Sequence, residues 1–479
     1  MPVQMPDINL GAMLPEILIT ILGLVVLLKS AKEDAEQGTR LMAMSIAGVV
    51  VAAAITLNAG NGTAFGGSFI NDLFARSMKL LMYVATGLVL FMSSGYMRQN
   101  RFDGGEYQVL TLMALLGGMF MASAGDFIML YLGLELMSLS IYVLAAWKRD
   151  DIRSNEAGLK YFVLGSMASG FLLYGITLIY GTTGTTLFTG VGQAMEHGHI
   201  ATATIMGVVL VLAGMSFKIA AAPFHMWAPD VYEGAPTSVT AFMAVLPKIA
   251  AFAGIFRVLL TAFPALQSHW NPLLQLLALL SLAVGAIAAI GQTNIKRMLA
   301  YSSIGHVGFI LIGMTTHSGL GYQSVIAYLA IYIVTSVGAF AMVLLLNRDG
   351  IGDETADYKG LAHRRPMLAL LMSLFMFSMA GIPPLAGFMG KLYVFMAAVQ
   401  SGMMLLAVAG VLFSAIGAFY YLRIVKFMYF DQPAEGAFTI SLNFQELAVL
   451  TVSGVIMLFW GLFPGGLLTW SSATVKMFL

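Results

Sequence analysis

The sequence predicts an all-α polytopic membrane protein with about 14 transmembrane helices, two of them discontinuous. Hydrophobic residues make up 59% of the 479 residues and charged residues only 10%, whereas soluble domains carry about 25% charged residues. Apolar runs of about 17–25 residues, the length that crosses a bilayer as a helix, recur along the whole chain. This pattern excludes a soluble globular protein.

Each predicted span is an apolar run bounded by polar or charged residues. The seventh run continues past Lys218 and Pro223 as a short segment to about Trp227, and the twelfth is over-long and holds Pro383-Pro384. Because proline interrupts the hydrogen bonds of a helix interior, we expect a break in both runs. The 14 spans lie at 10–29, 41–58, 76–97, 107–125, 127–147, 157–181, 201–222, 237–261, 272–291, 296–314, 320–346, 366–400, 403–428 and 446–470.

Composition also excludes several kinds of partner and cofactor. The chain has no Cys, so it has neither disulfides nor a thiolate-held iron–sulfur cluster. A net charge of +1 argues against binding to nucleic acid. No pair of its seven His falls at matched depth on two spans, and no metal-ligand spacing is present, so we expect no haem, metal or other cofactor in this chain.

Basic residues indicate the orientation of the chain, since they concentrate in cytoplasmic loops. Of 24 Lys and Arg, 17 fall on one face of the predicted topology, four on the other and three inside spans. We therefore expect both termini to be periplasmic, in the inner membrane of a bacterium. The four on the periplasmic face are Arg76, Lys79, Arg257 and Lys476, and the three inside spans are Lys218, Lys248 and Lys391.

The stretch from Ala213 to Phe252 places Lys218 and Lys248 inside apolar segments, with a proline-rich polar turn between them. A lysine at membrane depth costs on the order of a few kcal/mol, so it faces protein or water and is a functional candidate. Transporters use a broken helix with a buried charge at their midplane sites. We therefore expect both lysines to lie on an ion or proton path.

Glu135 lies near the middle of the fifth span, nine residues after Asp126, and it is the one acidic residue that we place deep in the membrane. It is either a structural carboxylate, hydrogen-bonded to its neighbours, or the ion-pair partner of Lys218. A carboxylate within about 4–6 Å stabilises a charged lysine, whereas burial alone disfavours the charge. We expect Glu135 and Lys218 to form a pair whose separation controls the release of a proton.

Three further residues are candidates for the same path. Lys248 lies about 11 residues inside the eighth span, too deep for a lysine whose long stem only reaches out to the interface. His306, in the tenth span, is either a hydrogen-bonded packing residue or a proton relay, and imidazole titration near neutral pH favours the relay. Lys391 follows Pro384 by seven residues, and we interpret it as the counterpart of Lys218 in a second unit.

The order of the spans indicates an internal repeat. Spans four to eight end with a broken helix and its successor, and spans nine to thirteen do the same. Five spans per unit is an odd number, so the second unit is expected to be inverted relative to the first. The predicted division is an N-terminal three-helix segment at 1–106, two five-helix units at 107–261 and 262–428, and a C-terminal loop and helix at 429–479.

Four stretches carry a resemblance to a known family: FKIAAAPFHMWAPDVYEGAPTSVTAF, GLELMSLSIYVL, QTNIKRMLAYSSIGHVGFILIG and AGIPPLAGFMGKLYVF. Through them nearly the whole chain resembles subunit N of bacterial NADH–quinone oxidoreductase (respiratory complex I), one of three subunits similar to Mrp-type cation/proton antiporters. The resemblance implies two inverted units, broken seventh and twelfth helices and a proton path along a central polar axis. It assigns proton translocation to Glu135, Lys218, Lys248, His306 and Lys391, and the helix breaks to Pro223, Pro383 and Pro384.

The resemblance implies a proton-translocating subunit of a redox-driven translocase, with no redox chemistry in this chain itself. NADH, FMN, iron–sulfur clusters and quinone would be bound by partner subunits. The partners would be the other membrane-arm subunits and, indirectly, the peripheral redox arm. Two alternatives stay open: a free-standing Na⁺/H⁺ antiporter of the Mrp kind, whose site chemistry is the same, and a structural membrane scaffold, against which the cost of three buried lysines counts.

Reporter fusions test the predicted orientation. Fusions at Leu479 and in the loop at 184–198 should report a periplasmic position, and fusions near Arg101 and Asp353 a cytoplasmic one, because basic loops stay in the cytoplasm. A cytoplasmic signal from the C-terminus would show that the count of 14 spans is wrong, and the predicted inverted repeat would lose its basis.

Overall fold

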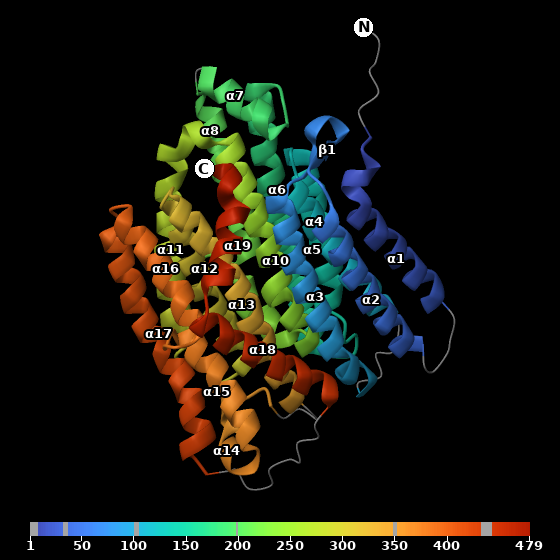
Figure 1. Ribbon diagram of the computed structural model, residues 1–479, viewed down its shortest axis with the longest axis vertical. Helices are drawn as coiled ribbons and strands as arrows, with labels where there is room; N and C mark the ends of the chain where they lie inside the picture. The colour runs from blue at the N-terminus through green and yellow to red at the C-terminus, as the bar shows by residue number, and fades with distance from the viewer. Residues whose placement is uncertain (1–7, 32–36, 100–104, 198–199, 348–351, 433–442) are drawn as a thin grey trace.

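The computed structural model describes residues 8–31, 37–99, 105–197, 200–347, 352–432 and 443–479. Most of the described helices run roughly along the long axis of the molecule, side by side (Figure 1). Twelve of them are long and apolar enough to cross a membrane. The predicted all-α membrane fold is confirmed.

The N-terminal part consists of three long helices and a small hairpin that the sequence analysis did not predict. The two strands pair antiparallel in the register Gly62–Asn71, and Gly66 and Gly67 take positive φ angles in the turn between them. The elements are η1 Leu10–Met13, α1 Leu14–Ser30, α2 Gln37–Asn58, β1 Gly62–Ala64, η2 Phe65–Gly67, β2 Phe69–Asn71 and α3 Leu73–Gln99.

The rest of the chain is helical within the described ranges. Its helices are α4 Glu106–Ser123, α5 Phe127–Ala145, α6 Ile152–Thr183, α7 Phe188–His197, α8 Thr202–Ile219, α9 Trp227–Gly234, α10 Thr237–Arg257, α11 Gln267–Ala288, α12 Ile295–Thr315, α13 Gly319–Leu346, α14 Leu361–Arg364, α15 Pro366–Ala380, α16 Ala386–Gln400, α17 Met404–Phe430, α18 Phe444–Leu462 and α19 Gly465–Val475. Short turns of helix are η3 Val258–Ala262, η4 Pro264–Leu266, η5 Thr355–Tyr358 and η6 Lys476–Phe478.

Each predicted span coincides with a helix or a pair of helices. The 12 membrane-length helices account for all spans except the fourth, which is α4, and the twelfth, which is the pair α15 and α16. In Figure 1, α7 and the hairpin of β1 lie toward one end of the bundle and α14 toward the other, and the C-terminus lies in the half that holds α7. The predicted boundaries between units at 107, 262 and 429 stay a prediction.

Three helices form the centre of the bundle. Every residue of α10 is buried, and α12 and α13 are buried almost throughout, whereas outer helices such as α2 and α17 keep one face exposed. Close helix packing in membranes uses small residues. Gly285 of α11 illustrates this, because a methyl group there would lie 2.4 Å from the backbone nitrogen of Gly305 in α12.

Both predicted helix breaks are confirmed. The chain leaves α8 at Ala220, which has a φ of 57°, and resumes as α9; it leaves α15 at Gly381, with a φ of 87°, and resumes as α16. Pro223 and the Pro383-Pro384 pair lie inside these two breaks. The short segment expected to end near Trp227 instead continues, because α9 begins there.

Backbone groups freed by the first break find side-chain partners, as groups at membrane depth must. The amide of Ala222 donates to Ser281 Oγ at 2.9 Å. The carbonyl of Phe217, near the end of α8, accepts from Trp227 Nε1 at 3.0 Å. The side chain of Trp227 in α9 thus supplies a hydrogen-bond donor to the end of α8. The two half-helices are therefore joined by this side chain as well as by the loop.

The fourteenth span is not the single helix that the sequence analysis placed at 446–470. The helix α18 ends at Leu462, and α19 begins after Pro464, which lacks the N–H needed to continue the helix. The end of α18 lies on the second break, since a methyl group on Gly461 would approach the carbonyl oxygen of Pro384 to 2.0 Å. The end of α19 then returns to α3, where Thr474 Oγ1 donates to Ser77 Oγ at 2.9 Å.

Two buried ion pairs correct the expected distribution of charge. Lys79, expected on the periplasmic face, is fully buried and pairs with Glu16, in the first turn of α1, at 2.6 Å, so it is not a solvent-exposed charge. Arg257 is also buried and holds both carboxylate oxygens of Asp72, at 2.7 and 2.8 Å. Glu16 and Asp72 lie at helix beginnings, where a single sequence does not reveal which residues tertiary contacts will bury.

The Glu16–Lys79 pair predicts an asymmetry between single and double variants. Glu16→Ala leaves an unpaired buried cation and should destabilise the α1–α3 contact by about 3–5 kcal/mol, whereas a double change of both residues to leucine should be much milder. Thermal stability of the purified protein measures the difference.

The exposed pair Lys426–Asp431, 3.7 Å apart, supplies the control, since Asp431→Ala should change little. Equal losses in the Glu16 single variant and in the double variant would show that the pair is not what joins these helices.

Candidate functional site

The four basic residues singled out in the spans lie inside the bundle. Lys218, Lys248, His306 and Lys391 are between 2% and 7% exposed, and they come from α8, α10, α12 and α16. Each of them contacts hydroxyl groups of neighbouring helices. The geometry of each contact determines what the site can do.

Lys218 lies in the last turn of α8, beside α5. Its Nζ donates to Ser138 Oγ at 2.9 Å and to the hydroxyl of Tyr142 at 3.0 Å. Ser138 and Tyr142 follow Glu135 by about one and two turns of the same helix, so the three share one side of α5. Two hydroxyls therefore take the place that the sequence analysis assigned to a carboxylate.

Glu135 is half-buried and is not in direct contact with Lys218. No ion pair within 4.0 Å joins the two in the described structure, although Ser138, which accepts from Lys218, follows Glu135 by about one helical turn. The Oε1 atom of Glu135 is buried and, among the described residues, has no hydrogen-bond partner. The predicted ion pair between Glu135 and Lys218 is therefore not formed in this structure.

A proline beside Lys248 shapes its surroundings. Pro247 has no N–H, so the carbonyl of Met243, four residues earlier, loses its helical donor. The hydroxyl of Tyr232 reaches this carbonyl at 3.4 Å and also accepts from Lys248 Nζ at 3.0 Å. The ammonium of Lys248 lies 5.9 Å from the ring centre of Tyr332.

Hydroxyl groups continue from α10 toward α12. The hydroxyl of Tyr332, in α13, donates to the carbonyl of Ala244 at 3.0 Å and lies 2.8 Å from Ser303 Oγ. Ser303 precedes His306 by three residues in α12. Polar groups therefore follow one another from Lys248 across α13 to the helix that carries His306.

His306 is hydrogen-bonded at both ring nitrogens. Its Nδ1 lies 2.8 Å from the hydroxyl of Tyr328, and its Nε2 lies 3.3 Å from the hydroxyl of Tyr421. A neutral imidazole donates from one nitrogen and accepts at the other. Because a phenol can also donate or accept, both tautomers of His306 fit the same positions, as a proton relay requires.

Lys391, in α16, is hydrogen-bonded to the C-terminal end of α15, the preceding half-helix. Its Nζ donates to the last two carbonyls of α15, Met379 at 2.8 Å and Ala380 at 2.9 Å, and to Ser414 Oγ at 2.9 Å. A cation is favoured at the C-terminal end of a helix. Lys391 and His306 line one cavity of about 20 Å³, roughly the volume of one water molecule.

Lys391 differs from Lys218 in its position relative to the break, and the interpretation of the two as counterparts stays a prediction. Lys218 belongs to the half-helix before its break, and Lys391 to the half-helix after. The sequence already shows this difference, because Lys218 precedes Pro223 whereas Lys391 follows Pro384.

Residues 124–417 match the family described as NADH:quinone oxidoreductase/Mrp antiporter, TM. The chain belongs to this family. Subunit N of NADH-quinone oxidoreductase from Magnetococcus marinus is 56% identical over 481 residues, which is 99% of each chain. A chain of respiratory complex I from Thermus thermophilus with bound aureothin is 32% identical, with a TM-score of 0.81 over 95% of this chain and 98% of that one. A chain of the Mrp complex from Dietzia shares the fold, with a TM-score of 0.84, at 20% identity and 98% coverage of both chains.

In this member of the antiporter family, sequence reasoning found the charged residues and the hydroxyl of Ser303 beside His306, and it missed the other hydroxyls. Those belong to Ser138, Tyr142, Tyr232, Tyr328, Tyr332, Ser414 and Tyr421. A weak signal was present for two of them, since Ser138 and Tyr142 follow Glu135 at helical spacing. The tyrosines of α9, α13 and α17 required the packing of distant helices.

The described side-chain hydrogen bonds around Lys218, Lys248, His306 and Lys391 form separate groups rather than one continuous chain. Tyr142, which binds Lys218, and Tyr232, which binds Lys248, are connected by ring contacts through Tyr161 and Trp227, whose centroids lie 4.2 Å apart. Among the described residues, no group of three or more His, Cys, Asp or Glu is placed to hold a metal ion.

Proposed function

We propose that this chain translocates protons as a membrane-arm subunit of an NADH–quinone oxidoreductase in a bacterial inner membrane, with both termini in the periplasm. NADH, FMN, iron–sulfur clusters and quinone would be bound by partner subunits. The observation that carries the proposal is the row of buried titratable groups, Lys248, His306 and Lys391, with hydroxyls between them. The 56% identity to a subunit N favours this function over a free-standing antiporter.

In this proposal a proton enters from the cytoplasmic side within the first unit and reaches Lys248. It then passes laterally toward His306 by way of hydroxyls such as Ser303, and it leaves through the second unit near Lys391. Hydroxyls suit this role because each can accept one proton and donate another. At a transmembrane potential of 100 mV, moving each proton outward costs about 2.3 kcal/mol. The path therefore needs a gate that stops protons from flowing back.

Glu135 supplies a gate of the required kind. In the structure Lys218 rests on two neutral hydroxyls, and Glu135 stands near but apart. A carboxylate in contact stabilises an ammonium more than a neutral hydroxyl does, so the distance between Glu135 and Lys218 controls how firmly the lysine holds its proton. Proton transfer through Lys248 would then depend on whether Lys218 is charged.

Alanine variants test this gate. Glu135→Ala and Lys218→Ala should each lower redox-driven proton pumping at least tenfold in the assembled complex, because each removes one half of the pair. Electron transfer from NADH to an artificial acceptor, which bypasses the membrane arm, should stay at the wild-type rate and serves as the control. Assembled variants that pump normally would remove both residues from the mechanism.

Lys248 tests whether the position must release its proton. Lys248→Arg should impair pumping nearly as strongly as Lys248→Ala, because arginine keeps its charge but hardly ever gives up a proton. His306→Lys should be milder, since it leaves a titratable amine in place. Pumping per NADH oxidised is the measurement. Wild-type pumping by the arginine variant would mean that Lys248 acts only as a fixed positive charge.

A further inference from the structure

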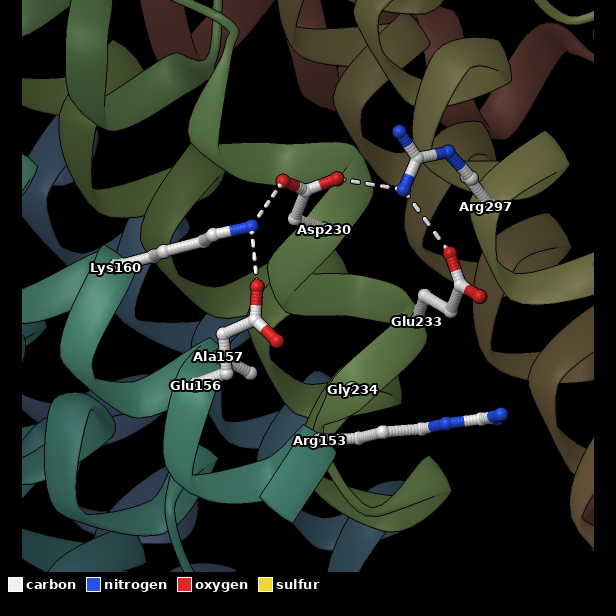
Figure 2. Close-up of a pocket in the computed structure, with 8 residues that line it drawn as sticks. All are labelled: Arg153, Glu156, Ala157, Lys160, Asp230, Glu233, Gly234 and Arg297. Atoms are coloured by element: carbon white, nitrogen blue, oxygen red, sulfur yellow. Dashed lines mark hydrogen bonds and ion pairs between the residues drawn. The ribbon is translucent and has the colours of Figure 1, made fainter.

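Away from the row of buried lysines, an open cavity of about 240 Å³ lies between α6, α9 and α12. Figure 2 shows the eight residues that line it, among them three acids and three bases. The three bases, Arg153, Lys160 and Arg297, all belong to the face that the sequence analysis predicts to be cytoplasmic. The charges balance, so the cavity does not select an anion or a cation.

Five of these residues form one chain of alternating charge, which we name the ion-pair chain: Glu156, Lys160, Asp230, Arg297 and Glu233. Lys160 lies 2.7 Å from Glu156 and 2.7 Å from Asp230. Arg297 lies 2.6 Å from Asp230 and 3.0 Å from Glu233. Asp230 is the central member, because one of its oxygens accepts from Lys160 and the other from Arg297 (Figure 2).

Asp230 and Glu233 belong to α9, the short second half of the broken helix. This helix has eight residues, and it is bounded by the break on one side and by Ala235-Pro236 on the other. Residues two apart on an α-helix point about 200° apart. Asp230 therefore lies opposite Tyr232, whose hydroxyl accepts from Lys248 at 3.0 Å. One side of α9 holds the ion-pair chain and the other holds the contact with Lys248.

The ion-pair chain also joins the two predicted units. Lys160 lies in α6 of the first unit, and Arg297 lies in α12 of the second. His306 follows Arg297 by nine residues, about 13.5 Å along the same helix. The helices that carry Tyr232 and His306 are thus held to one another through the carboxylate of Asp230.

We propose that the ion-pair chain is a latch on α9, in which Asp230 and Arg297 are positioning residues that set the contact between Tyr232 and Lys248. The inference rests on the proposed function, since the contact matters only if Lys248 transfers protons. The members of the chain are 30–57% exposed, and ion pairs with that exposure contribute little to overall stability. Loss of the latch should therefore change proton transfer more than assembly.

The test is a double-mutant cycle in the assembled complex, with pumping per NADH oxidised as the readout. Asp230→Asn and Arg297→Gln should each lower pumping about threefold or more, and Asp230→Glu, which keeps the charge, should recover most of it. Tyr232→Phe removes the hydroxyl that the latch positions. Asp230→Asn should add little to the loss in the Tyr232→Phe background, because both changes act through one contact.

Arg153→Gln is the matched control, since Arg153 lines the same cavity but takes part in none of the four ion pairs. It should pump like wild type. Additive losses in the cycle, or wild-type pumping by Asp230→Asn, would overturn the latch while leaving the proposed function intact if Lys248→Arg is still impaired. Failure of both Asp230→Asn and Arg297→Gln to assemble would also overturn it, because the ion-pair chain would then hold the fold. Wild-type pumping by Lys248→Arg would instead contradict the proposed function.

Discussion

The structure depends on the cost of placing an ammonium group in a dry membrane interior. Each buried lysine needs hydrogen-bond acceptors around its ammonium group, and within the described residues these are hydroxyls, backbone carbonyls or a carboxylate. Lipid supplies none of them. The charged residues therefore lie on the most enclosed helices, or face them, and the outer helices consist of apolar runs that separate this interior from lipid.

Helix interruptions supply much of what the charges need. Pro247 frees a carbonyl that draws Tyr232 to Lys248, and the end of α15 offers two carbonyls to Lys391. In a continuous helix these oxygens would be occupied by the next turn. For Lys248 and Lys391, the interruptions that look unfavourable in an apolar span thus help to supply polar partners near the lysine.

The fold and the charged residues were within reach of the sequence because each leaves a local signal. Apolar length predicted the spans, and a lysine inside such a span, such as Lys248, stands out without any structure. What failed were properties that require distant segments to meet. The burial of Lys79 depends on Glu16, and the contacts of Lys218 depend on how α5 packs beside α8. The end of α18 is a different case, since Pro464 is a local signal that the sequence analysis did not use.

The contacts of Lys391 tie its protonation to the shape of the backbone. A protonated lysine has three N–H groups, and three acceptors take them: the carbonyls of Met379 and Ala380 and the hydroxyl of Ser414. A neutral amine has two, so each departing proton leaves one acceptor without a donor. The carbonyl of Ala380 also accepts from Ser414 Oγ at 3.5 Å, whereas Lys391 is the one side chain that donates to the carbonyl of Met379 among the described residues. If Lys391 releases a proton, as the proposed function requires, the end of α15 is therefore where the hydrogen bonding would change.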